Sequence, residues 1–151
     1  MDIKNIDLKI ISWLRRWFLP FARFAIFVIY FYFGILKVFD LSPASPLAQA
    51  LVTETVGASH FDLLFHVLAV FECIIGILFL FPRLTRVVIP LLFLHMIIVC
   101  SPLIFVPHLA WSKPFVPTLE GQYIMKNLAI AALAIGIAAQ TKPLAAAKAK
   151  R

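Results

Sequence analysis

The stretch FDLLFHVLAVFECIIGILFLF (Phe61–Phe81) decides the fold, because it is long, almost wholly apolar, and carries Glu72 at its middle. At ~1.5 Å per residue, about 20 helical residues cross the ~30 Å apolar core of a bilayer. A carboxylate at the centre of such a span costs about 2.5–3.5 kcal/mol on insertion scales. We therefore expect Glu72 to face the protein interior and to have a partner there.

The composition indicates an integral membrane protein. Of 151 residues, 63% are hydrophobic and 14% are charged, whereas a soluble domain is about half apolar and about a quarter charged. The formal net charge of +7 does not indicate a nucleic-acid partner, because the basic residues lie at the ends of apolar stretches. In that position they report topology and contact anionic lipid, so the expected partner is the lipid bilayer and not a nucleic acid.

Four apolar stretches have the length of membrane spans: about residues 21–39, 62–81, 87–106 and 122–140. The sequence thus predicts an all-α fold, a four-transmembrane-helix bundle over residues 20–140. Pro90 and Pro102 lie near the ends of the third span, where proline is tolerated; Pro102 would bend or shorten the last turn. The proline-rich residues 107–121 are predicted to be a loop.

Residues 1–19 are predicted to form an interfacial amphipathic helix. Apolar residues recur at three-to-four spacing, and the other face is polar and largely basic. Such a helix, with Trp13 and Trp17 beside two arginines, is typical of the membrane interface. Pro20 is predicted to separate it from the first span.

The first loop is predicted to hold a short helix, about residues 46–56. Ser45-Pro46 resembles a helix start, and Gly57 a helix stop. Ser59-x-x-Asp62 is predicted to be a capping box that opens the second span.

The distribution of Lys and Arg predicts the orientation. Three basic residues lie on one side of the spans: Lys37, Lys113 and Lys126. The other basic residues lie on the opposite side: Lys4, Lys9, Arg15, Arg16, Arg23, Arg83, Arg86, Lys142, Lys148, Lys150 and Arg151. By the positive-inside rule both termini are cytoplasmic, and residues 141–151 form a basic cytoplasmic tail.

Helical spacing predicts which faces meet. Ala69, Glu72 and Gly76 form a stripe of small and polar residues on the second span, and Tyr30, Gly34 and Lys37 form another on the first.

Depth along the spans indicates which polar residues can meet Glu72. Lys37 and Lys126 each lie within about one turn of the outer end of a span. A lysine side chain is roughly 6 Å long, so either ammonium can extend towards Glu72. Both lysines are candidate partners, and the Glu72–Lys126 contact is the structural claim that we most expect to be tested. His66 lies at the level of Lys126, and Gln122 lies at the mouth of the same outer half.

These residues predict an outward-facing polar pocket. Its candidate ligand-binding or proton-handling residues are Glu72, Lys126, Lys37, His66, Gln122 and Tyr30. A structural role for Glu72, neutralised by a lysine or protonated by burial, is equally well supported.

Other chemistry is disfavoured. His66 and His95 are at different depths, so they are poor partners for a haem iron. Cys73 and Cys100 lack a C-x-x-C pattern and are interpreted as free, apolar thiols. There is no catalytic motif, zinc spacing or phosphate loop, so the sequence identifies no catalytic or metal-binding residue.

Three segments resemble the DoxX-like membrane proteins: FGILKVF (33–39), ECIIGILFLF (72–81) and TLEGQYIMKNLAI (118–130). The G-Q-aromatic-x-x-K-N pattern in the third is the most specific. The resemblance covers nearly the whole chain after the N-terminal helix. More narrowly, the three segments resemble the branch of this family that includes the reactive-chlorine-resistance inner-membrane protein.

The resemblance implies a multi-pass protein of the bacterial inner membrane with a tie to redox or oxidative-stress processes, because the founding member is a subunit of a thiosulfate–quinone oxidoreductase. Our hypothesis is an accessory subunit whose pocket around Glu72 binds a quinone or a lipid head group, or which supports a redox partner protein. Whether the chain is itself an enzyme stays open.

Two alternatives stand beside this hypothesis. One is a structural scaffold that docks a larger membrane complex. The other is a small transporter, which would have to be a homo-oligomer because four short spans enclose little. The absence of an internal repeat and of paired broken helices weakens the transporter hypothesis.

Overall fold

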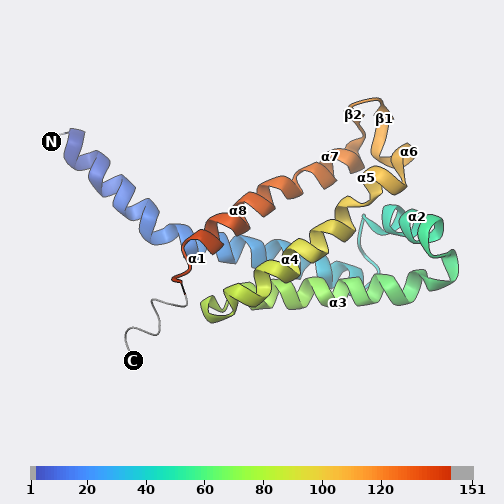
Figure 1. The fold of residues 1–151 in the computed structure, drawn as a ribbon, viewed down its shortest axis with the longest axis horizontal. Helices are drawn as coiled ribbons and strands as arrows, with labels where there is room; N and C mark the ends of the chain where they lie inside the picture. The colour runs from blue at the N-terminus through green and yellow to red at the C-terminus, as the bar shows by residue number, and fades with distance from the viewer. Residues whose placement is uncertain (1–2, 144–151) are drawn as a thin grey trace.

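A computed structural model of the chain describes residues 3–143, which form a bundle of long helices with smaller elements gathered at one end (Figure 1). The long helices are α1 (Ile3–Val38), α3 (Phe61–Phe79), α4 (Thr85–Cys100) and α8 (Asn127–Ala139). The short helices are α2 (Ser45–Thr55), η1 (Ala58–His60), η2 (Pro82–Leu84), α5 (Pro102–Phe105), α6 (Pro107–Ala110) and α7 (Leu119–Met125). The strands are β1 (Trp111–Lys113) and β2 (Val116–Pro117). Most of the predicted tail, residues 144–151, lies outside the described residues.

The predicted set of four long apolar helices is confirmed. Within residues 3–143, four helical segments are long and apolar enough to cross a membrane: Ile3–Val38, Ala58–Phe79, Pro82–Phe105 and Leu119–Ala139. No more than 28% of the residues in the apolar window of any of them are buried inside the bundle. Most of their apolar surface therefore faces outward, as expected of helices surrounded by lipid.

α1 and α3 pack closely, and the two predicted small-residue stripes explain why. A Cβ atom at Gly34 would lie 2.6 Å from Cys73 Sγ and 2.8 Å from the carbonyl oxygen of Ala69. A Cβ atom at Gly76 would lie 2.8 Å from the backbone nitrogen of Phe31. Both glycines thus stand where the opposite helix leaves no room for a side chain, as in close helix contacts generally.

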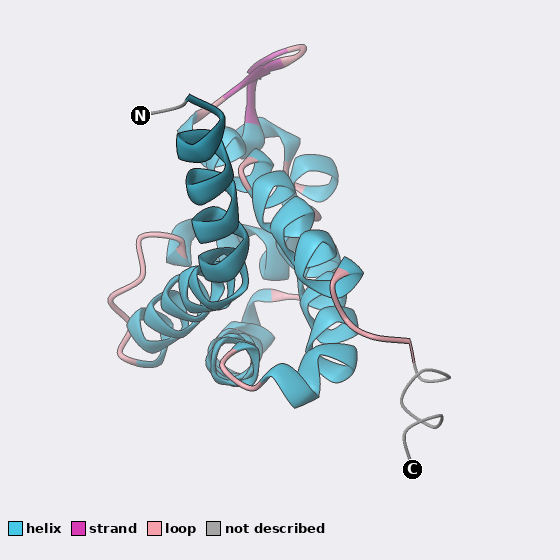
Figure 2. Ribbon diagram, turned by 90° about the vertical axis from the view of Figure 1, so that its left-hand side faces the viewer, coloured by secondary structure: helices cyan, strands magenta, loops and turns pink. Residues whose placement is uncertain are grey.

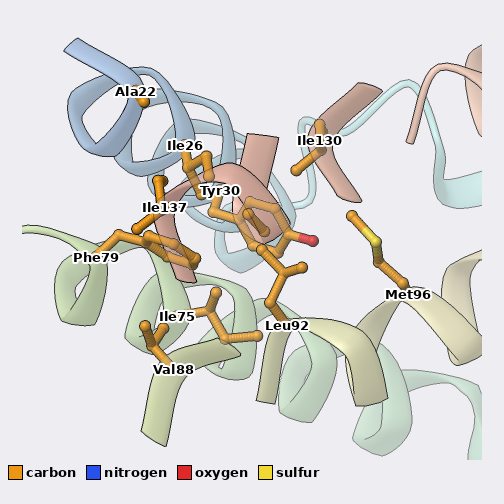
Figure 3. Close-up of a cluster of buried hydrophobic side chains, with 11 residues drawn as sticks. Ala22, Ile26, Tyr30, Ile75, Phe79, Val88, Leu92, Met96, Ile130 and Ile137 are labelled. Carbon is orange, nitrogen blue, oxygen red and sulfur yellow. The ribbon is translucent and has the colours of Figure 1, made fainter. Parts of the chain in front are cut away.

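The core is apolar and is supplied by all four long helices (Figure 3). Its fully buried members include Ile26 of α1, Phe79 of α3, Leu92 of α4 and Ile137 of α8. α8 packs against α4 and α1, whereas α3 packs mainly against α1 and α4. This neighbour order decides which polar side chains meet.

The N-terminal helix does not end at Pro20, contrary to the prediction. α1 continues through Pro20, and its first part leaves the bundle at an angle (Figure 1). A proline removes one backbone hydrogen bond and crowds the preceding turn, which bends a helix without necessarily ending it. From Ile3 to Phe18 every residue except Ile6 is exposed, although the Phe18 ring lies beside Gly136 of α8. The placement of this amphipathic segment in a membrane interface stays a prediction.

The predicted helix of the first loop is present as α2, and Gly57 follows it with φ of +101°, a conformation that favours glycine. The predicted capping box was wrong. His60, and not Ser59, is the N-cap of α3, and it makes no side-chain capping bond. The turn η1 precedes α3 directly, so the backbone of Ser59 is already helical and its hydroxyl instead contacts His60 Nδ1 at 3.2 Å.

The third predicted span is broken at Ser101, between α4 and α5, as the proline at position 102 suggested. The predicted loop 107–121 was only partly right, because it contains α6 and a small antiparallel hairpin in which Trp111 faces Pro117. The hairpin holds the only strands among the described residues (Figure 2). So short a pair gives little periodic signal in the sequence.

The two ends of the bundle differ. We call the end where α3 connects to α4 the basic end; Arg23, Arg83, Arg86 and Lys142 lie there. Arg86 Nη2 donates a hydrogen bond to the Lys142 carbonyl at 2.5 Å, which ties the end of the fourth span to the start of the third. We call the opposite end, with α2 and the β1–β2 hairpin, the hairpin end. The separation agrees with the charge pattern, while the assignment of either end to the cytoplasm stays a prediction.

Candidate functional site

Glu72 is buried in the middle of α3, with 4% of its surface exposed, and it has two charged or polar partners. Lys37 Nζ of α1 donates to Glu72 Oε2 at 2.5 Å. His95 Nε2 of α4 lies 2.9 Å from Glu72 Oε1. Three helices therefore converge on one carboxylate, as its cost in an apolar bundle led us to expect.

The hydrogen bonds continue from His95 to Tyr30. Tyr30 Oη of α1 lies 3.2 Å from His95 Nδ1, and the tyrosine and imidazole rings meet edge to face at 5.0 Å. With Glu72 ionised and His95 neutral, the carboxylate can only accept, so Nε2–H donates to Glu72 and Nδ1 accepts from Tyr30. We call Lys37, Glu72, His95 and Tyr30 the polar chain.

Local packing explains why Glu72 meets Lys37. Gly34 lies one turn before Lys37, and Gly76 lies one turn after Glu72. Because α1 and α3 run antiparallel, the two glycine contacts lie on the same side of the ion pair and hold the two helices close together beside it. Both side chains are nearly inaccessible, with 9% of Lys37 and 6% of Glu72 exposed. A buried pair is tolerable only when its hydrogen bonds are made. Among the described residues, every buried side-chain nitrogen and oxygen has a partner.

A cavity of about 130 Å³ adjoins the polar chain, and all four members of the chain line it. The rest of its wall is largely apolar and comes from several helices. These residues include Phe33, Leu47, Leu51, Ile98, Val99 and Ile124. An apolar cavity with a few convergent polar groups is the usual form of a small-molecule site.

Lys126 lines the same cavity, but it does not pair with Glu72, so the expected contact between them was wrong. Its Nζ lies 3.0 Å from the centroid of the Tyr123 ring and 5.3 Å from that of Phe33, a cation–π arrangement. Lys126 sits at the junction of α7 and α8, and this part of the chain packs on α4 and α1 rather than on α3. Depth alone ranked the two lysines equally; the neighbour order favours Lys37.

His66 and Gln122 do not belong to the site. The His66 side chain is 46% exposed, with Nδ1 2.8 Å from the Asp62 carbonyl and Nε2 3.9 Å from Asp40 Oδ1. His66 and Glu72 are six residues apart, which at about 100° per residue separates their directions by roughly 120° around α3. Gln122 is exposed, because Gly121 and Ile124 form the buried face of α7.

His95 is the residue that sequence reasoning missed as a partner of Glu72. Its signal was available: His95 and Glu72 both lie near the middle of their spans, so two polar groups share one depth. On the fourth span, helical spacing predicts a packing face made of Tyr123, Asn127, Ala134 and Ala138. Of these four residues only Ala134 is buried, alongside Ile130 and Ile137.

Within residues 3–143, no group of three or more His, Cys, Asp or Glu side chains that could hold a metal ion occurs. Cys73 and Cys100 are free and half-buried. Cys73 Sγ faces the backbone of α1, 3.9 Å from the Phe31 carbonyl oxygen, which fits a packing role.

Comparison with protein-family models, with curated proteins and with solved structures found no match to this chain. The function must therefore be argued from the site.

Proposed function

We propose that this chain is a multi-pass protein of the bacterial inner membrane, with both termini cytoplasmic, whose cavity binds a quinone head group. The observation that carries the proposal is the polar chain, which joins three helices along one wall of an otherwise apolar cavity. The resemblance to DoxX-like proteins supports a role in redox or oxidative-stress processes.

The size of the cavity suits one ring. Its volume of about 130 Å³ is close to the ~150 Å³ of an apolar cavity that holds benzene. Phe33 and Ile98 offer apolar contact to the faces of a ring. A lipid acyl chain would fit these walls equally well, but it would make no use of the polar groups.

The polar groups suit carbonyl oxygens. The Lys126 ammonium makes no hydrogen bond to the described residues, so it can donate to a carbonyl of the ring. Lys37 uses only one of its three N–H donors in the contacts of the described residues. Reduction of a quinone to a quinol consumes two electrons and two protons. The polar chain can conduct the protons, while the electrons come from a redox partner protein.

A structural scaffold is the second candidate. It is favoured because every buried polar atom of the polar chain already has at least one partner within the protein. The scaffold predicts a dry cavity and no effect of filling it.

Cavity filling separates the two candidates. Ala48 lines the cavity, and Ala132 is exposed on the outer surface of α8. The chain should be purified in mild detergent, its co-extracted quinone quantified by absorbance and chromatography, and decylubiquinone binding measured by titration calorimetry. We expect the wild type and Ala132→Phe to bind equally, and Ala48→Phe to lose at least about tenfold in affinity, because the added ring occupies the ligand volume. No binding by the wild type, or equal binding by Ala48→Phe, would refute the proposal.

A carboxylate exchange tests the role of the polar chain. Glu72→Gln keeps the shape of the side chain and removes its charge, and Glu54→Gln makes the same change at an exposed carboxylate. If the polar chain handles protons, Glu72→Gln slows the proton uptake that accompanies quinone reduction, whereas Glu54→Gln leaves it unchanged. Full affinity and full proton-linked activity in Glu72→Gln would exclude this role.

A further inference from the structure

A second polar site lies at the basic end, on the far side of the core from the polar chain. Arg23 of α1 is buried, with 9% of its surface exposed. Its Nη1 donates to the Phe79 carbonyl oxygen at 3.2 Å, and its Nη2 donates to Thr85 Oγ1 at 2.6 Å. Both acceptors are neutral, so these bonds orient the guanidinium without balancing its charge.

Within residues 3–143 no carboxylate balances the charge of Arg23. Among the described residues Arg23 forms no ion pair. The sequence explains this, since no Asp or Glu occurs between Leu8 and Phe39, between Cys73 and Leu119, or after Glu120. The segments that surround Arg23 are thus free of acidic residues, and they add the cations Arg86 and Lys142. A buried charge ordinarily has a counter-charge.

A crevice of about 590 Å³ opens beside Arg23, where the N-terminal part of α1 leaves the bundle. One part of its wall is polar and includes Thr85, Gln140 and Lys142. The other part is apolar and includes Leu19, Phe24, Leu80 and Ile137. The lining therefore combines a cationic, hydrogen-bonding region with an apolar surface.

The donors that remain at Arg23 suit a phosphate. A guanidinium carries five N–H donors in a planar fork that matches phosphate oxygens, and two of them are used in the contacts above. Inorganic phosphate would satisfy the polar wall but would leave the apolar wall without contact. A phospholipid supplies both a phosphate and apolar chains.

We propose that this crevice binds the phosphate of an anionic phospholipid, with Arg23 as the residue that recognises it and the apolar wall in contact with an acyl chain. The basic end is the end predicted to be cytoplasmic, where anionic lipids attract basic residues. The proposal rests on the membrane placement proposed above and is independent of the quinone site, because none of the residues that line the crevice lines the cavity.

The test compares lipids and variants. The chain is reconstituted in nanodiscs of phosphatidylcholine with or without phosphatidylglycerol. Native mass spectrometry then identifies the lipids that stay bound when the protein is released from the nanodiscs. We expect the wild type to retain one phosphatidylglycerol in preference to phosphatidylcholine. In detergent, titrated phosphatidylglycerol should bind Arg23→Gln at least about tenfold more weakly than the wild type, the factor that corresponds to a lost charge-assisted hydrogen bond. Arg83→Gln, which removes an exposed cation at the same end, should bind as the wild type does.

Further measurements decide for or against the proposal. Leu80→Trp fills the apolar wall without touching the guanidinium, so weaker retention by this variant supports the site even if Arg23→Gln does not fold. Equal retention of the two lipids by the wild type would overturn the proposal. Protection of the fold by inorganic phosphate to the same extent as by phosphatidylglycerol would overturn the lipid assignment in favour of free phosphate. Failure of quinone binding would leave all of these outcomes unchanged.

Discussion

Removal of Lys37 is the sharpest test of the buried polar chain. Lys37→Met keeps the length and apolar bulk of the side chain but leaves the Glu72 carboxylate without its cation. The Nζ–Oε2 distance of 2.5 Å corresponds to a gross attraction of about 7 kcal/mol at an effective dielectric constant of about 20. Desolvation offsets much of this attraction, but a carboxylate left alone costs about 3–5 kcal/mol.

A double variant measures the free energy of interaction between Lys37 and Glu72. Lys37→Met with Glu72→Met removes both charges and leaves His95 without its acceptor on one side, a loss of about 1–3 kcal/mol. We therefore expect the double variant to be more stable than either single variant. This ordering is the signature of a buried charge pair.

The assay is equilibrium unfolding in mixed micelles, followed by circular dichroism, with Lys113→Met as the control at an exposed lysine. The control should be within about 0.5 kcal/mol of the wild type. Strictly additive effects, or a loss below about 1 kcal/mol in Lys37→Met, would refute the argument that Glu72 depends on Lys37.

Three further changes test the packing. Gly34→Ala should destabilise the bundle by about 1–3 kcal/mol, because its new Cβ would lie 2.8 Å from a backbone oxygen of α3; Gly136→Ala, where the nearest contact is 3.4 Å, should be neutral by the same unfolding assay. Thr118→Ala should cost about 1 kcal/mol in thermal unfolding, since Thr118 Oγ1 accepts from the Gly121 backbone N–H at 3.1 Å and caps α7; an unchanged midpoint would show that the cap is unimportant. Gly57→Ala should lower the free energy of unfolding by about 1–3 kcal/mol, because φ is +101° there. A melting temperature equal to that of the wild type would show that alanine is not strained at this position.

The sequence determined the number and helical nature of the apolar elements, because hydropathy and the reach of a helix depend on local composition alone. It also identified Gly34 and Gly76 as parts of packing faces, because a small-residue stripe repeats at helical spacing; that these two faces meet each other is a result of the tertiary structure. The same reasoning placed Glu72 in the interior. Pro20 was misjudged because a proline weakens a helix locally, and whether the helix bends or ends depends on its surroundings.

The tertiary structure alone decided the partners of Glu72. Depth along a span can be counted from the sequence, and it admitted Lys37 and Lys126 alike. The choice depends on which helices are neighbours and on how each is rotated about its axis, and long-range packing sets both. α3 lies against α1 and α4, so Lys37 and His95 reach the carboxylate, while the Lys126 ammonium lies over the Tyr123 ring.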